Sequence, residues 1–359
     1  MNTIRFKRAG LKWIRRGFFI SLFSTGMILN AQVSAEKVVK LVNVEDKQRV
    51  DVFVNGTLFT SYRYPGNIEK TFLYPVYSPD GSVITRGYPV EPRKGDRVDH
   101  PHHIGMWFNH GNVNGLDFWN NSSSIPADQK DLYGHIVHKK INIIAGGRRG
   151  ILEVVMDWND NKGNTILTEN CRYIFEGDKN SRTIDHVSTL TAVAGPVTFG
   201  DSKEGLFAIR VDRAFEMPTT EPLVFVDEKG NPTTIKAIDN KGVTGMYTSS
   251  NGLKGDSVWG TRNGWVILTG TKNNVIISMA IFDSPKNPGY PAYAHARGYG
   301  LFSVNNFGQN SYDPKQEKRS YVIEKGKPVT LYHRFYIKSG SALTSEQANK
   351  IFKEFSKEY

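Results

Sequence analysis

Four of the nine histidines lie between positions 100 and 110. The run begins Asp-His-Pro-His-His at position 99 and continues through an Asn/Gly-rich segment to Asp117-Phe118-Trp119. Imidazoles titrate and bind metals near neutral pH, amides and carboxylates bind hydroxyls, and indoles offer flat apolar faces. A core strand would not carry so much polarity, and a solvated loop would not carry so many aromatic rings. We therefore interpret this segment as the wall of a functional site.

The second half of the histidine-rich stretch has a length suited to a β-strand. Side chains in a strand alternate between its two faces. Alternation places His103, Trp107 and Asn109 on one face, where His103 could act as an acid or base and Trp107 could stack on a ligand. The opposite, mostly apolar face, which includes His102 and Ile104, should pack inward. The alternative is a buried polar network whose histidines are hydrogen-bonded for structural reasons.

A metal site is a separate hypothesis for the same stretch. His100-x-His102 could place two imidazoles on one side of an extended chain, so these two are the candidate ligands for a divalent metal. No glutamate follows at the spacing typical of such sites, Pro101 interrupts a strand, and the side chains of His102 and His103 should point apart. The main interpretation requires no cofactor, and a divalent metal is the alternative.

The segment that follows has the composition of a sugar-binding loop. Asn112 and Asp117 offer an amide and a carboxylate for sugar hydroxyls, and Trp119 offers a platform for a pyranose face. The alternative is a tight Gly/Asn turn with Trp119 buried.

Two later segments carry similar chemistry. Glu204 precedes a predicted strand, where it could serve as acid or base, and Arg210 could hold a substrate carboxylate. A solvated Lys203/Glu204 pair with Arg210 in a structural salt bridge is the alternative reading. Residues 295–299 read His-x-Arg-x-Tyr, which in an extended chain puts an acid or base, a cation and a phenol on one face.

These residues must be positioned by strands, because turn signals recur at short intervals and helical periodicity is nearly absent. Asn55-Gly56 between two apolar runs predicts a hairpin. One helix is expected near the end, with Thr344 and Gln347 as a capping box, to cover an edge or face of a sheet. Predicted strands also include residues 82–87 and 223–226. The fold class is therefore all-β, a large antiparallel β-sandwich with one C-terminal amphipathic helix.

Residues 1–35 have six basic and no acidic residues, an apolar stretch and a Val-Ser-Ala end, which predict a secretory signal peptide. We expect export to a bacterial periplasm, cell surface or medium, and one domain over residues 36–359. Without the leader the net charge falls from +11 to +5, which indicates no nucleic-acid partner, and no membrane span is expected in the mature chain. The single cysteine, Cys171, cannot form an intramolecular disulfide.

With these motifs in view, the chain resembles a family of secreted bacterial proteins labelled PmoA-like or "methane oxygenase". The matching residues are Asp99-His100-Pro101-His102-His103, Trp107-Phe108, His110-Gly111, Val113-Asn114-Gly115, Asp117-Phe118-Trp119, Lys203-Glu204-Gly205, His295-x-Arg297-x-Tyr299-Gly300-Leu301 and Asn305/Phe307-Gly308. Ala294 and Asn306 depart from the aromatic residue and the proline expected at those positions. A methane monooxygenase subunit spans the membrane several times, whereas the resemblance implies a sugar-processing sandwich similar to the aldose-epimerase supersandwich.

The leading hypothesis is an exported carbohydrate-active enzyme (a hydrolase, lyase or epimerase) acting on a sugar or oligosaccharide. Glu204 with His103 or His295 would form the acid–base pair, and Arg297 would stabilise negative charge or hold an acidic sugar. The residues assigned to substrate binding are Trp107, Asn112, Asp117, Trp119, Arg210 and Tyr299. The alternatives are a non-catalytic glycan-binding protein of an uptake system and a histidine-ligated metal oxygenase. The enzymatic hypotheses require the early histidine run and the late His-x-Arg-x-Tyr segment to meet.

Overall fold

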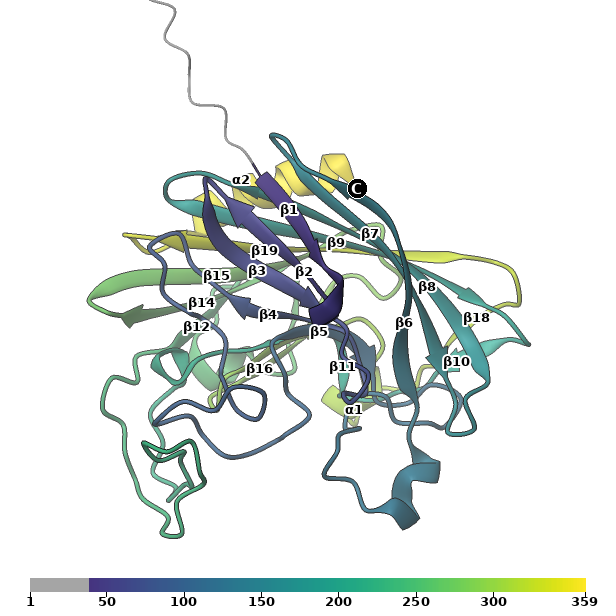
Figure 1. Ribbon diagram of the computed structural model, residues 1–359, viewed down its shortest axis with the longest axis horizontal. Coiled ribbons are helices and arrows are strands. Elements are labelled where there is room, and N and C mark those ends of the chain that lie inside the picture. Colours follow the sequence, from purple (N-terminus) through teal and green to yellow (C-terminus); the bar gives the residue numbers. More distant parts are fainter. Residues whose placement is uncertain (1–38) are drawn as a thin grey trace, which may run out of the picture. The chain divides into compact units, whose positions relative to one another are not determined.

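Two antiparallel sheets pack against each other in the computed structural model, which describes residues 39–359 (Figure 1). The predicted signal peptide lies outside the described residues. Within them, no helix is both long and apolar enough to span a bilayer.

The first sheet, counted over residues 39–359, has nine strands, and all of the site strands belong to it. In spatial order they are β1 (Val39–Val44), β2 (Arg49–Val54), β3 (Thr57–Arg63), β4 (Phe72–Val76), β5 (Met106–His110), β11 (Gly205–Arg210), β17 (Leu301–Asn305), β16 (Ala292–Arg297) and β13 (Arg262–Asn263).

The second sheet has eight strands within the described part of the chain. In spatial order they are β12 (Met246–Ser249), β14 (Trp265–Lys272), β15 (Val275–Asp283), β19 (Val329–Ser339), β9 (Ser181–Ala192), β8 (Thr165–Gly177), β7 (Gly150–Asn159) and β6 (His135–Ala145). A small third pair joins β10 (Val197–Phe199) to β18 (Tyr321–Ile323).

In the part of the chain that the structure describes, the helices are short apart from the last one. They are the 3-10 turns Glu45–Lys47, Ala127–Leu132, Arg213–Phe215 and Gly255–Val258, and the helices α1 (Gln309–Tyr312) and α2 (Ser345–Glu358). Helix α2 begins with the predicted capping box, since the Thr344 side chain accepts from the Gln347 backbone and Gln347 bonds back. Its buried Ala348 and Phe355 pack on Trp265 of β14, so the helix covers the outer face of the second sheet (Figure 1).

The all-β sandwich and its terminal helix are confirmed. The Asn55-Gly56 hairpin is also confirmed, because both residues have the positive φ angles that its turn requires. Residues 82–87 and 223–226 are not strands. Their backbones meet partners only at isolated positions such as Thr85 with Val211, so no ladder forms.

The register of the first sheet decides which side chains share a face. Trp107 pairs with Ala208, Ala208 with Ser303, and Ser303 with His295, so these four lie in one row across β5, β11, β17 and β16. Neighbouring positions such as Phe207 point the other way, into the main core between the sheets. The row therefore lies on the sheet's outer face, where loops cover it.

Candidate functional site

Aromatic rings stack over the outer face of the first sheet. Tyr299 stacks on His100 with ring centroids 4.8 Å apart, His100 on His103 at 4.8 Å, and His103 on Trp107 at 5.3 Å. The first three rings are nearly parallel, with interplanar angles of 7° and 4°. We call Tyr299, His100, His103, Trp107 and Trp119 the ring stack.

Trp119 extends the ring stack toward β16. Its indole lies 5.1 Å from that of Trp107 and 6.3 Å from the imidazole of His295, measured between ring centroids. Space for it exists because Ala208 and Ser303, the positions between Trp107 and His295 in the row, carry small side chains. The two histidine-bearing segments, 192 positions apart between His103 and His295, therefore meet on one face, as the sequence analysis requires.

A buried ionic network fixes the base of the ring stack. Asp99 Oδ1 lies 2.5 Å from an Arg86 nitrogen and 2.6 Å from an Arg210 nitrogen, and Asp99 Oδ2 lies 3.0 Å from Arg97 Nε. Glu216 lies 3.7 Å from Arg210. Burial raises the pKa of Glu216 to about 7, whereas the Arg210 charge holds the pKa of Asp99 well below its usual range despite burial.

The same network sets the protonation of His103. Arg210 lies 3.3 Å from His103 Nδ1 and can only donate, so Nδ1 accepts and the ring proton sits on Nε2. Burial lowers the pKa of His103 well below its usual value, so the ring stays neutral. Nε2 is buried and has no hydrogen-bond partner within residues 39–359. A buried donor of this kind costs about 1–3 kcal/mol until an acceptor arrives.

Glu204 and His295 face each other at the other end of the ring stack. Glu204 Oε2 lies 3.9 Å from His295 Nδ1, and Nδ1 is a buried atom without a hydrogen-bond partner among the described residues. Burial raises the pKa of Glu204, and burial followed by the Arg297 charge lowers the pKa of His295 to about 3. The Glu204 side chain is 20% exposed and His295 is 3% exposed. Glu204 is therefore the member of the pair that solvent reaches, and His295 is the member that contacts the buried rings.

Sequence reasoning missed several charged residues beneath the rings. Lys70 is buried, its Nζ lies 5.0 Å from the Trp107 ring and donates to the Trp119 carbonyl at 3.3 Å. Burial lowers its pKa to about 7. Lys70, Arg86 and Glu216 lie in connecting segments, and no local motif marks them, because only the packing of those segments brings them under the ring stack.

Arg210 and Asn112, assigned to substrate binding from the sequence, have structural roles instead, and the two tryptophans are more buried than expected. Arg210 is fully buried and binds Asp99 of the chain itself, so it is not available to a substrate carboxylate. Trp107 and Trp119 are 1% and 0% exposed, so they form the floor and not an open platform. Asn112 accepts the Gly115 backbone N–H within its turn.

Asp117 and Asp201 are also engaged by their own loops. Asp117 accepts from the backbone N–H groups of Trp119 and Asn120 at 2.8 and 2.9 Å, and from the Asn120 side chain. Asp201 accepts three backbone N–H groups, from residues 310, 311 and 319. Asp117 still affects the site, because its charge raises the pKa of Glu204.

The predicted alternation around the histidine run is only partly correct. Trp107 and Asn109 share a face and are hydrogen-bonded at 3.1 Å, but Asn109 is fully buried and donates to a backbone carbonyl. His102 and His103 do not point apart: their ring centroids are 4.3 Å apart, because residues 100–103 form a turn in which His100 has a positive φ. Ile104 therefore joins the apolar cluster of the outer face and not the inner core.

The late segment departs from alternation in a similar way. Strand β16 ends at Arg297, so His295 and Arg297 share the outer face, whereas Tyr299 lies in the turn to β17. Tyr299 still reaches the site, because its ring packs on His100 with the Arg210 guanidinium 5.0 Å away. Arg297 is exposed, with its guanidinium 5.8 Å from the Tyr299 ring.

The candidate metal ligands do not gather into a metal-binding group. The His100 and His102 ring centroids are 5.7 Å apart, and His100 Nδ1 lies 3.2 Å from Asp99. Over residues 39–359, the group of three side chains close enough to hold an ion is Glu169, Cys171 and His186, which lies inside the sandwich.

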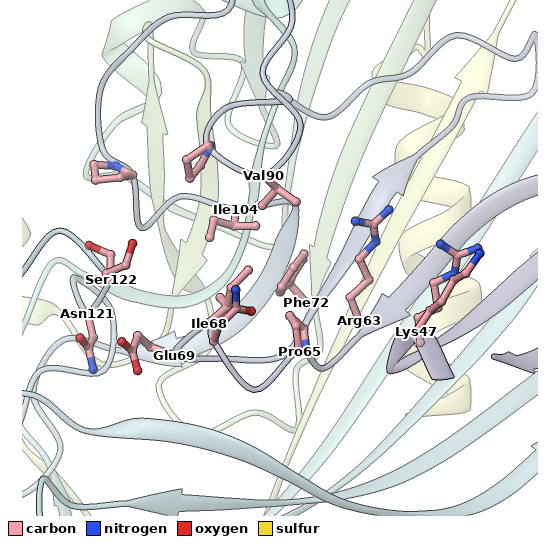
Figure 2. Close-up of a pocket in the computed structure, with 15 residues that line it drawn as sticks. Lys47, Arg63, Pro65, Ile68, Glu69, Phe72, Val90, Ile104, Asn121 and Ser122 are labelled. Carbon is pink, nitrogen blue, oxygen red and sulfur yellow. The ribbon is translucent and has the colours of Figure 1, made fainter. Parts of the chain in front are cut away.

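A pocket of about 580 Å³ opens next to Ile104 and Phe72 (Figure 2). Its lining includes Pro101 and Ile104 of the histidine segment and Phe72 of β4. Phe72 and Ile104 belong to the same apolar cluster as Trp107 and Trp119, so the pocket wall and the ring stack pack on each other.

A family model matches residues 49–353, which is most of the chain. Its description is "Family of unknown function (DUF6807)". The chain belongs to this family. The match covers the ring stack, Glu204 and His295, and every pocket-lining residue except Lys47. The expected PmoA-like membership is not confirmed by the comparisons, and no curated protein matches the chain.

Solved structures resemble this DUF6807 chain only remotely. A GH36 alpha-galactosidase from Geobacillus stearothermophilus in complex with 1-deoxygalactonojirimycin has 10% identity and a TM-score of 0.40, over 85% of this chain and 41% of that one. A galactose mutarotase-like protein from Clostridium acetobutylicum has 11% identity and a TM-score of 0.32, over 84% and 99%. A putative aldose 1-epimerase from Escherichia coli K12 has 8% identity and a TM-score of 0.24, over 84% and 98%. The chain spans about two fifths of the alpha-galactosidase length.

Proposed function

We propose that the protein is an exported carbohydrate-active enzyme in which Glu204 and His295 form an acid–base pair. The observation that carries this proposal is the 3.9 Å separation of Glu204 Oε2 and His295 Nδ1, where Nδ1 is buried and has no hydrogen-bond partner within the described chain. That separation is too long for a direct hydrogen bond. A substrate hydroxyl or a water between the two atoms can donate to either one.

The protonation states suit this role. His295, with its pKa lowered to about 3, is neutral at pH 7, so Nδ1 is free to accept a substrate hydroxyl proton, although it is a weaker base than a histidine of ordinary pKa. Glu204, with a pKa raised by burial, gives up and regains a proton more readily near neutral pH than a solvated carboxylate does. One group can take a proton from a sugar hydroxyl while the other delivers a proton to the ring or glycosidic oxygen. No net proton, electron or metal is required for this exchange.

The unpartnered groups favour a neutral, hydroxyl-rich ligand. His103 Nε2–H and Trp119 Nε1–H are buried donors without acceptors among residues 39–359, and Glu204 is a partly exposed acceptor. Donors and acceptors beside flat rings are the groups that bind sugar hydroxyls and ring faces. We therefore assign His103 to orienting the substrate. Tyr299 and Arg297 lie at the edge of the site that solvent reaches.

The arrangement favours proton transfer over hydrolysis by two carboxylates. A hydrolase of that kind needs a second free carboxylate across the sugar from Glu204. Asp117 and Asp201, the carboxylates on the loops nearest Glu204, each accept three hydrogen bonds from their own or neighbouring loops. Epimerisation at the anomeric carbon is therefore the reaction that we propose first: the anomeric hydroxyl loses its proton, the bond from that carbon to the ring oxygen breaks, and the ring oxygen takes up a proton.

The test combines turnover with binding. The purified protein is incubated with a mixed oligosaccharide library and products are followed by NMR, which separates epimerisation, elimination and hydrolysis. We expect Glu204→Gln and His295→Ala to abolish turnover while calorimetry shows affinity for the same sugar unchanged within about threefold. His135→Gln, a half-buried histidine on β6, is the matched control and should keep full activity.

Two outcomes would decide for the alternatives. Sugar binding with no turnover in the unaltered protein would identify a non-catalytic glycan-binding protein. Stoichiometric iron or copper in protein purified from its native compartment, with turnover that depends on it, would favour the oxygenase.

A further inference from the structure

The pocket beside the ring stack changes character from one end to the other. Lys47 and Arg63 line one end, and Glu69, Asn121 and Ser122 line the other (Figure 2). Between them lie the apolar side chains of Pro65, Ile68, Phe72, Val90 and Ile104 (Figure 2). Arg49 and Asn67 also belong to the lining. A ligand that fits this pocket has a flat apolar surface, hydroxyl or amide groups at one side and negative charge at the other.

The basic end retains the capacity to bind an anion. Lys47 has no ion-pair partner anywhere in the described chain. Arg63 binds Glu91 at 2.9 Å through one terminal nitrogen, but Glu91 is 54% exposed, so solvent weakens that pair. The Arg63 Nε is buried and has no hydrogen-bond partner within residues 39–359. A guanidinium has five donors, so Arg63 can bind a second anion beside Glu91.

The acidic residue at the opposite end is already neutralised. Glu69 lies 3.0 Å from Lys130 Nζ, which also donates to the Ser122 carbonyl. Arg49 is likewise engaged, because its Nε lies 2.9 Å from Asp51 Oδ1. Lys47 and Arg63 are therefore the lining cations that an incoming anion can meet.

The pocket and the ring stack share two loops. Pro101 and Ile104 flank His102 and His103, and Asn121 and Ser122 follow Trp119 after one residue. One ligand longer than a single sugar can therefore contact both. We propose that the pocket is a second subsite that binds an acidic sugar unit, carrying a carboxylate or a sulfate, of the same oligosaccharide. This inference rests on the proposed function, because it takes the ligand to be a sugar.

The volume is consistent with this occupant. About 580 Å³ lies within the 300–1,000 Å³ of typical small-molecule sites. The apolar wall suits the C–H face of a sugar ring. The Asn121 amide already bonds to the Gly134 carbonyl and to Lys130, so Asn67 and Ser123 are the lining side chains that suit its hydroxyls.

The test measures binding alone, with three defined probes. Ligand-observed NMR titrations at low salt compare glucuronic acid, glucose 6-sulfate and glucose. We expect at least one acidic probe to bind fivefold or more tightly than glucose, and that preference to shrink as salt is raised to 0.5 M. A preference for glucuronic acid alone would identify a carboxylate site, and a preference for the sulfate alone would identify a sulfate site.

Variants connect the preference to the named cations. Arg63→Gln and Lys47→Gln should each reduce the preference at least threefold, and the double variant should remove it. Lys94→Gln is the control, because Lys94 is exposed, pairs with Glu228 and lies outside the pocket lining. Lys47 is in an exposed 3-10 turn, so Lys47→Gln keeps the test decisive if Arg63→Gln does not fold.

Equal binding of the three probes, or an unchanged preference in the double variant, would overturn the subsite. Glu204→Gln should keep the acidic preference in full. Failure of the acid–base proposal would therefore leave the pocket result intact, and loss of the pocket result would leave Glu204 turnover untouched.

Discussion

Two clusters of histidines and carboxylates lie on opposite sides of the first sheet. One is the outer site, with His103, His295 and Glu204. The other lies between the sheets, where His186 on β9 and His333 on β19 stack against Phe207 at 5.1 and 5.2 Å. Both clusters have imidazole nitrogens without hydrogen-bond partners among the described residues.

The two clusters differ in the surroundings of their carboxylates. Inside the sandwich, Glu169 accepts from Trp158 and Ser188 at 2.8 and 2.7 Å and is 1% exposed. On the outer face, Glu204 is 20% exposed and its nearest cationic partner is Lys203 at 3.4 Å. A free imidazole nitrogen is therefore not enough to mark a site. A site also needs a carboxylate that solvent and substrate can reach.

The largest expected difference between the clusters is in activity. We predict that His295→Gln lowers kcat/KM by about 10²–10⁴-fold, because it removes a proton-transfer group, while the free energy of unfolding changes little. His186→Gln should do the opposite: it loses ring packing and costs stability while activity stays within twofold. Turnover of the substrate found by the oligosaccharide screen, together with urea unfolding, checks both. Equal losses of activity in the two variants would show that the outer and inner clusters do not differ in function.

The second difference concerns charge beneath the rings. Asp99→Asn leaves the side chains of Arg86, Arg97 and Arg210 around a neutral amide, so we expect a loss of about 3–5 kcal/mol in the free energy of unfolding. Glu169→Gln in the interior should cost no more than about 1–2 kcal/mol, because burial already raises the pKa of Glu169 to about 7 and its partners are neutral. Chemical denaturation measures both. A smaller loss for Asp99→Asn than for Glu169→Gln would contradict this assignment.

Acid sensitivity should also come from the outer cluster. A buried histidine with a lowered pKa takes up its proton only on unfolding, so below pH 6.5 it reduces stability as pH falls. A buried carboxyl with a raised pKa has the opposite sign, because the folded state holds the proton between pH 7 and 4.5. Inside the sandwich, His186 and His333 are offset by Glu169, with a pKa of about 7, and Asp283, with a pKa of about 6.

The outer face holds a further set of shifted groups. Burial lowers the pKa of His102, of His103 and of His295, and burial raises the pKa of Glu216 and of Glu204, which offsets two of the three. A net uptake of about one proton at pH 5 predicts a loss of about 1.4 kcal/mol of stability per pH unit. The double variant His103→Gln/His295→Gln should abolish this loss, whereas Glu169→Gln/His186→Gln should leave it in place. Unfolding measured at pH 5, 6 and 7 decides between them.

The sequence predicts the polar residues better than it predicts their partners. Turn chemistry and alternation are local, so the hairpin at Asn55-Gly56 and the capping box at Thr344 follow from neighbours in the chain. The high density of histidines between residues 100 and 110 led to the candidate site on the outer face. The structural role of Arg210 could not be predicted from its neighbours in the chain, because its partners Asp99 and Glu216 lie on separate loops. Strand periodicity also cannot predict the turn at residues 100–103, which stacks His100 on Tyr299.

The smallest expected difference isolates one hydrogen bond. Trp119 and Trp158 are both fully buried, but Trp158 Nε1 donates to Glu169 at 2.8 Å, whereas Trp119 Nε1 has no acceptor within the described residues. Each Trp→Phe change removes similar volume, so the cavity cost is comparable. We expect Trp158→Phe to cost about 1–3 kcal/mol more than Trp119→Phe, because Glu169 loses a buried donor.

Ligand binding should reverse that order. Trp119→Phe removes a buried donor that has no acceptor among the described residues, so we expect it to weaken sugar binding by about tenfold, as loss of one buried hydrogen bond of about 1.4 kcal/mol would. Trp158→Phe should leave sugar affinity within twofold. Urea unfolding with and without sugar at one fixed concentration gives both numbers from one series, since a ligand stabilises by RT ln(1 + L/Kd) at free ligand concentration L. If sugar stabilises the two variants equally, the Trp119 indole faces no ligand, and the outer cluster is as closed as the inner one.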